Sequence, residues 1–523
     1  MTLVAGADFG TQSVRVSVME TDTGQVRGSA TAPYPLHRSP TDPLVARQSH
    51  DDQMAALARA MRGALDQAGV AGSDIAALAA DTTGSSVVML DHRLRPLADY
   101  YLWCDHSAHA EAAEITERAR AEGLEALAWC GGTYSHEWGY SKLLHFLRHN
   151  PDLRGELATV AENCDMVAAT LCGIDDPRQM PRSVCAMGHK WLWGRRWGGL
   201  PPQEFLTRVD PLLAGINARI TGRFGHSLDL AGHLGRAWAD RLGLAPGIPV
   251  PVGAFDAHWD AVGVGCGPGD VVNVVGTSTC IIALGDPDGG PVAGICGAVP
   301  DSVIPGAMGL EAGQSATGDL FEAIARRAGT DVAGLSQGLE GRAPGASGLL
   351  RLPWDNGDRT VLVRPDLGGV TLGWDLGHDA ADELHAAIEG MAMHMRLIVE
   401  RMQTGGTRFG RVINAGGIPQ RNPALNQIYA DVLGRAVHVP AASPVGVGAC
   451  IFAAMAAGAF ASIDEAQRVM APATRVFEPD PARHARYAEL MALFTDLYFG
   501  FGEGRPCDLA RVLPTLRRFR LAG

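Results

Sequence analysis

The chain has 523 residues, 44 of them basic and 57 acidic, and its net charge of −13 provides no overall positive field to attract nucleic-acid phosphates. A chain of this length corresponds to about two to four domains. The 46% hydrophobic content and the 65 glycines exclude a disordered chain and indicate a globular protein with many tight turns.

The cysteines and the first residues favour a cytoplasmic protein. The ten cysteines form neither C-x-x-C pairs nor close Cys/His ligand sets, and a chain of this size does not need disulfides. The N-terminal residues lead into a strand-like segment without signal-peptide features, and the apolar run IPVPVGAF is too short to span a membrane. We therefore expect reduced thiols, a cytoplasmic location, and neither a membrane nor a nucleic-acid partner.

The chain begins with a predicted strand, turn and strand. Residues 4–7 are short and apolar, Gly10-Thr-Gln-Ser is typical of a turn, and residues 14–18 alternate apolar with polar side chains. Rossmann and Walker phosphate loops lead instead from a strand into a helix, and neither of their glycine motifs is present here. Asp8, just before the turn, either orients a magnesium ion on a transferring phosphate or caps a hairpin.

Two later segments have helical periodicity. Residues 54–65 carry apolar side chains three or four positions apart, which places them on one helix face. A longer stripe over residues 384–402 is rich in methionine and stops before Gly405 and Gly406, as helices often do before glycine. We predict that this stripe packs in the core and does not hold a cofactor.

The segment 269–284 repeats the N-terminal pattern of strand, Gly-Thr turn and strand. Gly276-Thr-Ser-Thr corresponds to Gly10-Thr-Gln-Ser, which is 266 residues earlier (276 minus 10). A repeat at half the chain length predicts two similar domains that face each other, because stacked solenoid repeats have much shorter periods. Turns rich in backbone N–H groups bind anions, so the two turns are suited to hold one polyphosphate.

A proline cluster separates the two predicted domains. Pro246, Pro249 and Pro251 precede a strand-like approach to Asp256, and such clusters commonly mark joints. We place the boundary near residue 253. This gives an N-terminal domain of residues 1–253 and a C-terminal domain of residues 254–523 that ends in closing helices.

Asp256 is a candidate general base. It follows a hydrophobic run and precedes an Ala/Gly-rich segment that we predict to be helical. Its carboxylate either caps that helix or accepts the proton of a sugar hydroxyl as the oxygen attacks phosphorus. The sequence alone does not choose between these roles.

Other candidates lie later in the chain or among apolar residues. Residues 412–434 predict a strand, a Gly-Gly turn and a helix; such glycines let a ribose or flat ring approach the backbone, although a plain strand-to-helix turn has the same pattern. Lys190 and Glu311 are charged residues among small and apolar ones, where burial without a partner is costly. They serve either structural ion pairs or the hydroxyls of a polyol pocket.

Taken together, these motifs resemble the FGGY family of carbohydrate kinases over nearly the whole chain, and within that family the L-ribulokinases. The resemblance rests on GADFGTQSVR, LWCDHSAHAEA, GGTYSHEWGYSKLLH, RSVCAMGHKWLW, GAFDAHWDAVG, VVGTSTC, GLEAGQSATGDLF and AGGIPQRNPALNQIYADVLGR. It implies an α/β fold of two duplicated actin-like domains, of the ribonuclease H-like, hexokinase type, with ATP and sugar in an interdomain cleft.

The resemblance also implies roles for individual residues. Asp256 would be the catalytic base, and Asp8 would lie beside Mg²⁺, through water or directly, and the γ-phosphate. The implied ATP and phosphate contacts are Asp8, Thr11, Gln12, Ser13, Arg15, Gly276, Thr277, Thr279, Gly313, Gly417 and Asn422. The implied sugar contacts are Gly84, Lys190, Asp256 and Glu311.

Two positions depart from the ribulokinase pattern and bear on the substrate. The family segment F-T-[AS]-C-T is replaced here by Thr-Thr-Gly-Ser-Ser after Asp81, and the lysine of L-W-K-D-H is replaced by Cys104. The expected activity is ATP- and Mg²⁺-dependent phosphorylation of a terminal hydroxyl of a ketopentose, foremost L-ribulose to L-ribulose 5-phosphate, by a homodimer. The alternatives are a kinase for D-ribulose, xylulose, a tetritol or another polyol, and a non-catalytic, nucleotide-gated sugar-binding regulator.

Overall fold

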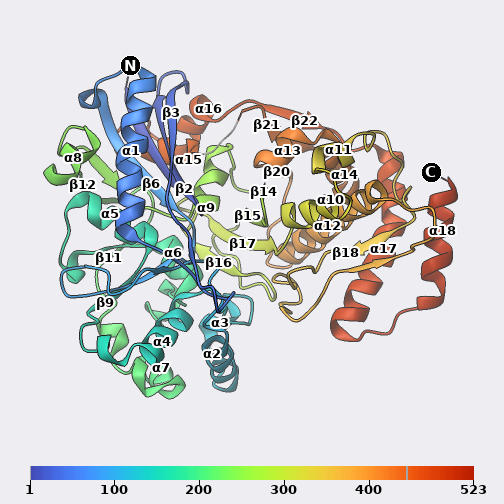
Figure 1. Cartoon of the computed structure of the whole chain (residues 1–523), viewed down its shortest axis with the longest axis horizontal. Coiled ribbons are helices and arrows are strands. Elements are labelled where there is room, and N and C mark those ends of the chain that lie inside the picture. The colour runs from blue at the N-terminus through green and yellow to red at the C-terminus, as the bar shows by residue number, and fades with distance from the viewer. Residues whose placement is uncertain (1, 443–445, 523) are drawn as a thin grey trace. The chain divides into compact units, whose positions relative to one another are not determined.

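The computed structural model describes residues 2–442 and 446–522, which form two compact units (Figure 1). Unit 1 is built from the described parts of Met1–Gly267, Gly297–Gly309 and Pro444–Pro472. Unit 2 is built from those of Pro268–Cys296, Leu310–Ser443 and Ala473–Gly523. Each unit therefore takes in several segments and does not coincide with residues 1–253 or 254–523. Asp256 belongs to unit 1.

The main sheet of unit 1 contains the predicted N-terminal hairpin. Its order is β3 (Val26–Pro33), β2 (Ser13–Glu20), β1 (Leu3–Phe9) and β6 (Ile75–Thr82). β1 pairs antiparallel with β2 and parallel with β6, and β2 pairs antiparallel with β3. The predicted strand, turn and strand are confirmed.

Helices α1 (His50–Ala68) and α15 (Val447–Ala456) pack on this sheet. A Cβ on Gly6, which pairs with Ser17, would lie 2.7 Å from the backbone of α15. A Cβ on Gly28, which pairs with Val18, would lie 2.3 Å from the backbone of α1. Because successive strand residues point to opposite faces, the two helices cover opposite sides of the sheet. The predicted apolar face over residues 54–65 is buried in α1.

The rest of unit 1 is a second sheet with helices and short strands around it. That sheet has the order β4 (His37–Arg38), β5 (Ala46–Gln48), β8 (Tyr100–Tyr101), β7 (Val87–Leu90) and β9 (Thr159–Glu162). The other strands are β10 (Pro181–Ser183), β11 (Arg223–Gly225), β12 (Leu230–His233), β13 (Pro249–Pro251) and β16 (Gly297–Pro300). The other helices are α2 (His109–Ala121), α3 (Glu125–Ala128), α4 (Gly139–His149), α5 (Asn163–Cys172), α6 (Val184–Lys190), α7 (Gln203–Val209), α8 (Arg236–Leu242), α9 (Asp256–Gly263) and α16 (Ile463–Met470).

Unit 2 has a sheet with the same central arrangement. Its strands follow the order β17 (Met308–Gln314), β15 (Thr279–Gly285), β14 (Asp270–Val275), β20 (Arg411–Ala415), β21 (Val437–Pro440) and β22 (Thr474–Phe477). β14 pairs antiparallel with β15 and parallel with β20, as β1 does with β2 and β6. The duplicated topology predicted from the two Gly-Thr turns is therefore present.

The helices of unit 2 include the predicted methionine-rich one. α12 (Ala380–Gln403) begins at a capping box between Asp379 and Asp382 and ends just before Gly405, and its methionines are buried in the core. The remaining elements are β18 (Leu350–Leu352), β19 (Val370–Leu372), α10 (Gly318–Arg327), α11 (Val332–Ser336), α13 (Gly417–Arg421), α14 (Pro423–Leu433), α17 (Pro481–Glu503) and α18 (Val512–Ala522). Within residues 2–442 and 446–522, no helix has the length and apolar character needed to cross a membrane.

Candidate active site

The first turn, Gly10–Ser13, is held through its carbonyl oxygens. The Tyr34 hydroxyl donates to the Gly10 carbonyl at 2.5 Å. The Gln48 amide donates to the Thr11 carbonyl, also at 2.5 Å. These contacts engage the groups that would repel a phosphate, which suits the turn to the anion-binding role predicted for Thr11 and its neighbours.

Four carboxylates gather beside this turn. Asp8 in β1 is in register with Asp81 in the parallel strand β6 and with Arg15 in the antiparallel strand β2. Helix α9 carries Asp256 in its first turn and Asp260 one turn later, on the same face. The end of β6 is bridged to the residue just before α9, so the helix begins next to the paired strands.

The electrostatics of this cluster favour a bound cation. Burial raises the pKa of Asp8, and its hydrogen bond to Asp81 and the charge of Arg15 act against this rise. Burial, followed by the charges of Asp8, Asp260 and Asp256, raises the pKa of Asp81 well above its ordinary value. Oδ1 of Asp81 is buried and, within the described part of the chain, has no hydrogen-bond partner. Carboxylates crowded in this way fit Mg²⁺, which prefers oxygen ligands.

Asp256 is not the cap of its helix. The N-cap position of α9 is Phe255, and Asp256 is the first helical residue, where one carboxylate oxygen accepts from the Ala257 N–H at 2.7 Å. A carboxylate at a helix N-terminus is stabilised as an anion by the helix dipole. The side chain is half-buried, so it remains accessible to a substrate hydroxyl.

Two of the predicted sugar contacts, Gly84 and Lys190, lie beside the Phe255 ring. A Cβ on Gly84 would lie 3.0 Å from this ring, so the ring packs directly on the glycine. The Lys190 ammonium lies 5.5 Å from the centre of the same ring and 5.3 Å from the Trp138 ring. Asp256 follows Phe255 directly. The buried ammonium therefore lies beside two aromatic rings, one of which belongs to the residue just before the candidate base.

Lys142 is a residue of this region that the sequence analysis missed. Its side chain is fully buried, and its ammonium donates to the carbonyls of Ser85 at 2.5 Å and Leu102 at 2.6 Å. Burial lowers its pKa to about 7. Ser85 follows Gly84 and has a positive φ of 60°, so Lys142 stabilises the turn that carries a predicted sugar contact. A lysine within the largely apolar segment SKLLHFL was the available signal.

In unit 2, the second turn is held by a helix N-terminus. The Thr317 N–H donates to the Thr277 carbonyl at 2.9 Å, and the Gly318 N–H donates to the Gly276 carbonyl at 3.0 Å. The hydroxyls of Thr279 and Thr317 are 2.7 Å apart. The carbonyls of this turn are therefore engaged, as in the first turn, although by backbone donors of α10.

Gly313 and Arg359 lie next to the second turn. A Cβ on Gly313 would lie 2.6 Å from the Thr279 carbonyl oxygen and 2.8 Å from Nε of Arg359. Nη2 of Arg359 donates to the Ser278 hydroxyl at 3.5 Å. The sequence analysis missed Arg359, which adds a positive charge beside this turn. Glu311 is half-buried on the same strand as Gly313, two residues before it.

The predicted Gly-Gly turn connects β20 to α13. Gly416 has a φ of 97°, and a Cβ there would lie 2.4 Å from the Val275 carbonyl oxygen, so a side chain does not fit. Gly417 begins α13. Asn422 is the N-cap of α14, where its side-chain oxygen accepts from the Leu425 N–H at 3.0 Å. The structure thus gives Asn422 a capping role, and its predicted adenosine contact stays a prediction.

The structure brings together one cysteine and two histidines that the sequence analysis did not single out. Cys185 and His189 lie four residues apart on α6, and the fold brings His258 of α9 next to them. The spacing C-x-x-x-H was visible in the sequence. The third residue comes from a distant segment, and for this reason inspection of local motifs did not detect the set.

Comparison with known proteins identifies the family. Residues 3–180 match the N-terminal domain of the FGGY family of carbohydrate kinases, and residues 271–457 match its C-terminal domain. A ribulokinase from Vibrio parahaemolyticus is 32% identical over 539 residues, which cover 94% of this chain and 95% of that protein. The chain belongs to the FGGY family of carbohydrate kinases. A second FGGY relative, a ribulokinase from Anoxybacillus flavithermus, is 33% identical over 545 residues, with 96% and 95% covered.

The fold of the chain is also found in a solved structure. The xylulose kinase from Rhodospirillum rubrum superposes with a TM-score of 0.82 at 23% identity, covering 98% of this chain and 100% of that one. At this identity the likeness shows the fold alone. It confirms the predicted α/β fold of two actin-like domains.

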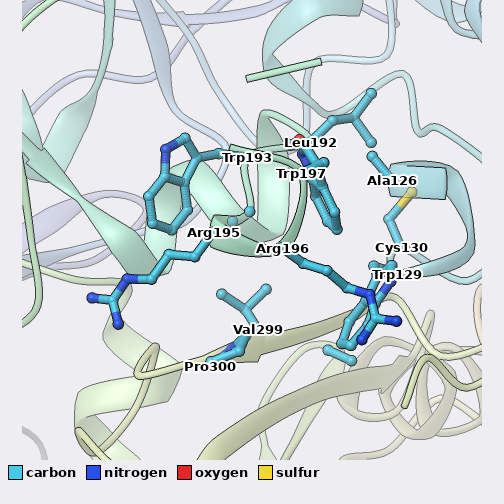
Figure 2. Close-up of a pocket in the computed structure, with 13 residues that line it drawn as sticks. Ala126, Trp129, Cys130, Leu192, Trp193, Arg195, Arg196, Trp197, Val299 and Pro300 are labelled. Atoms are coloured by element: carbon cyan, nitrogen blue, oxygen red, sulfur yellow. Dashed lines mark hydrogen bonds between the residues drawn. The ribbon is translucent and has the colours of Figure 1, made fainter. Parts of the chain in front are cut away.

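A small cavity in unit 1 is lined by residues other than the predicted FGGY site residues, and Figure 2 shows this lining. Its volume is about 60 Å³, and tryptophans 129, 193 and 197 contribute to its lining. The two lining arginines are paired, Arg195 with Asp301 at 2.7 Å and Arg196 with Glu125 at 2.8 Å. The cavity is too small for a sugar or a nucleotide, which occupy pockets of about 300 Å³ or more.

Proposed function

We propose that this FGGY protein is an ATP-dependent ketopentose kinase that converts L-ribulose to L-ribulose 5-phosphate. The curated relatives named ribulokinase match it over nearly its whole length. The observation that carries the proposal is the position of Asp256. Its helix begins directly after Phe255, which packs on Gly84 and is bridged to the end of the strand that bears Asp81. Asp8 lies opposite Asp81 on the neighbouring strand. This arrangement supports the proposal that the base, one wall of the sugar pocket and the cation site all belong to unit 1.

In the proposed reaction, Asp256 accepts the proton of the sugar hydroxyl as its oxygen attacks the γ-phosphorus. A new oxygen–phosphorus bond forms, the bond from the γ-phosphorus to the bridging oxygen of ADP breaks, and ADP leaves. Thr11, Gln12, Ser13 and Arg15 would bind phosphate oxygens from unit 1. Asp8 and Asp81 would hold Mg²⁺, which neutralises phosphate charge when bound.

The nucleotide is assigned to unit 2. Gly276, Thr277 and Thr279 would bind phosphates, and Gly313, Gly417 and Asn422 would contact the adenosine. Gly313 packs against the Thr279 carbonyl and has no side chain to cover the second turn, which supports the assignment of this turn to the phosphates. Glu311 would reach the sugar hydroxyls from its strand.

The substrate is tested by a panel of ketopentoses, tetritols and hexitols, with ADP release measured in a coupled assay. L-Ribulose is expected to give the highest kcat/KM. A higher kcat/KM for D-ribulose, xylulose or a tetritol would change the assigned substrate but retain the assignment as a kinase. If none of these sugars or polyols increases ATP consumption, the result would instead favour the non-catalytic regulator that closes on nucleotide.

We further propose that the kinase acts in the cytoplasm as a homodimer. Light scattering coupled to size-exclusion chromatography would give a mass of twice 55.1 kDa if this is correct. A mass of 55.1 kDa across the working concentration range would contradict the dimer.

A further inference from the structure

A buried thiol and two buried imidazoles converge between helices α6 and α9 of unit 1. Cys185 and His189 lie four residues apart and therefore on one face of α6, and His258 is contributed by α9. Their exposed fractions are 2%, 1% and 1%. The cysteine sulfur and one ring nitrogen of each histidine all lie within 4.8 Å of one another.

The spacing of the two imidazoles is that of a hydrogen bond and also fits two ligands of one metal ion. Nε2 of His189 and Nε2 of His258 are hydrogen-bonded at 3.2 Å, with the rings at 60°. Two nitrogens bound to one tetrahedral zinc ion at about 2.0–2.1 Å lie about 3.3 Å apart. The Ser302 hydroxyl is 3.1 Å from Nε2 of His189 and donates to the Val299 carbonyl at 2.9 Å, so a lone pair of its oxygen is available next to His189.

His189 is held in this orientation by the backbone. A Cβ on Gly297 would lie 2.1 Å from Nδ1 of His189, so the ring packs directly on the glycine. Nε2, on the far side of the ring, is thereby directed toward His258 and Ser302. A ligand fixed in this way loses little conformational entropy when a metal binds.

The donor set selects the class of metal. A thiolate and two imidazoles suit a borderline cation such as Zn²⁺ or Co²⁺, whereas Mg²⁺ requires oxygen ligands. A second cluster, Glu111 with His145 and His149, is a weaker candidate, because Glu111 is already paired with Arg148 at 3.3 Å and His149 is exposed.

We propose that Cys185, His189 and His258 bind one zinc-class divalent cation, with water or the Ser302 hydroxyl in the fourth position. The metal would join α6 to α9. His189 immediately precedes Lys190 and His258 follows Asp256 by two residues, so the bound ion would fix the spacing between these two site residues. The site is chemically distinct from the carboxylate cluster at Asp8.

The test uses the full chain, stripped of metal with a chelator and titrated with Co²⁺. One equivalent per chain should give a near-ultraviolet thiolate-to-cobalt band and the visible bands of a tetrahedral site. Cys185→Ser should lose the thiolate band, and His258→Gln should weaken Co²⁺ binding about tenfold or more. Cys172→Ser, which changes another cysteine of unit 1, should keep both the thiolate band and the affinity for Co²⁺.

Zinc content after equilibrium dialysis gives a second readout that does not depend on activity. The wild-type chain should retain one zinc, with a higher melting temperature than the stripped protein. Absence of a thiolate band in the wild-type chain, or its persistence in folded Cys185→Ser, would overturn the proposal. Should Cys185→Ser fail to fold, the wild-type cobalt spectrum alone decides. Failure of kinase activity would leave these results unaffected.

Discussion

The two Gly-Thr turns share a topology and differ in what holds them. Each connects an antiparallel pair whose first strand also pairs in parallel with a later strand. In unit 1 the turn closes from the Gly10 N–H to the Ser13 carbonyl, whereas in unit 2 it closes from Gly276 to Ser278, one residue sooner. Side chains engage the first turn, and the N-terminus of α10 engages the second.

The charges around the two turns differ more strongly than their backbones. The first turn has Asp8, Asp81, Asp256 and Asp260 around it, whereas the second has the guanidinium of Arg359. A duplicated scaffold can therefore carry opposite local charge, because the sheet fixes the turn while distant segments supply its surroundings. On our account, unit 1 supplies the base, the cation site, the first phosphate turn and most sugar contacts, and unit 2 supplies Glu311 and the other nucleotide contacts.

Loss of Lys142 is expected to have the largest effect on sugar binding. In Lys142→Ala the carbonyls of Ser85 and Leu102 lose their donor while buried, at about 1–3 kcal/mol each, so the turn at Gly84 loosens. We expect the KM for sugar to rise about 10- to 100-fold and the KM for ATP to change little. Steady-state kinetics checks this split.

A small alkylammonium ion that fills the space should partly restore the sugar KM of Lys142→Ala. A folded Lys142→Ala enzyme with normal sugar KM would break the proposed link between this lysine and the sugar site.

Loss of Arg359 should have the converse effect. Arg359→Gln removes the positive charge beside Ser278, and the KM for ATP should rise about tenfold while the KM for sugar stays nearly constant. Arg364→Gln, which removes a surface arginine paired with Asp366, is the matched control in unit 2. Equal effects of the two substitutions would contradict a nucleotide role for Arg359.

Gly84 offers a further test on the sugar side. In Gly84→Ala the new methyl group meets the Phe255 ring at 3.0 Å and displaces it, together with Asp256. Overpacking costs about 1–3 kcal/mol, so we expect kcat/KM for sugar to fall about 5- to 100-fold. Adding Phe255→Leu should recover part of this loss, and strictly additive effects would show that the contact does not matter.

The smallest effect concerns the stability of unit 1. Burial, and after it the charges of Asp8 and Asp256, raises the pKa of Asp260 well above 3.8. Because the pKa of Asp260 is higher in the folded than in the unfolded state, its carboxyl does not destabilise the fold below about pH 4, where it is protonated in both states. As pH rises through the folded-state pKa, the buried carboxyl must ionise and the free energy of unfolding falls.

Asp260→Asn should therefore raise the melting temperature of the metal-free protein by a few degrees at pH 8, with a much smaller difference near pH 4. Thermal scans in chelator at several pH values check this. A difference independent of pH would mean that Asp260 is not held protonated.

The sequence was sufficient where the signal is local. The hairpin at residues 3–20, its echo at residues 270–285 and the long helix at residues 380–403 each follow from short-range periodicity and glycine placement. The two units are harder to predict, because α15 returns to the N-terminal sheet from near the end of the chain. No local pattern reveals that return.

The site shows the same limit. Asp8 and Asp256 were predicted from their motifs, and their carboxylate neighbour Asp81 became evident only from strand register. Lys142 reaches Ser85 from a helix 57 residues later, and Arg359 reaches Ser278 across 81 residues. Tertiary contacts of this kind depend on the whole fold, which explains why inspection of single motifs missed them.

The most direct test of the central claim is Asp256→Asn with L-ribulose as the acceptor. The amide keeps the shape of the side chain but cannot take a proton at neutral pH, so kcat should fall by about 10²-fold or more. ATP affinity, measured by calorimetry, should stay within about twofold of the wild-type value. Near-normal turnover in this variant would contradict the assignment of Asp256 as the base.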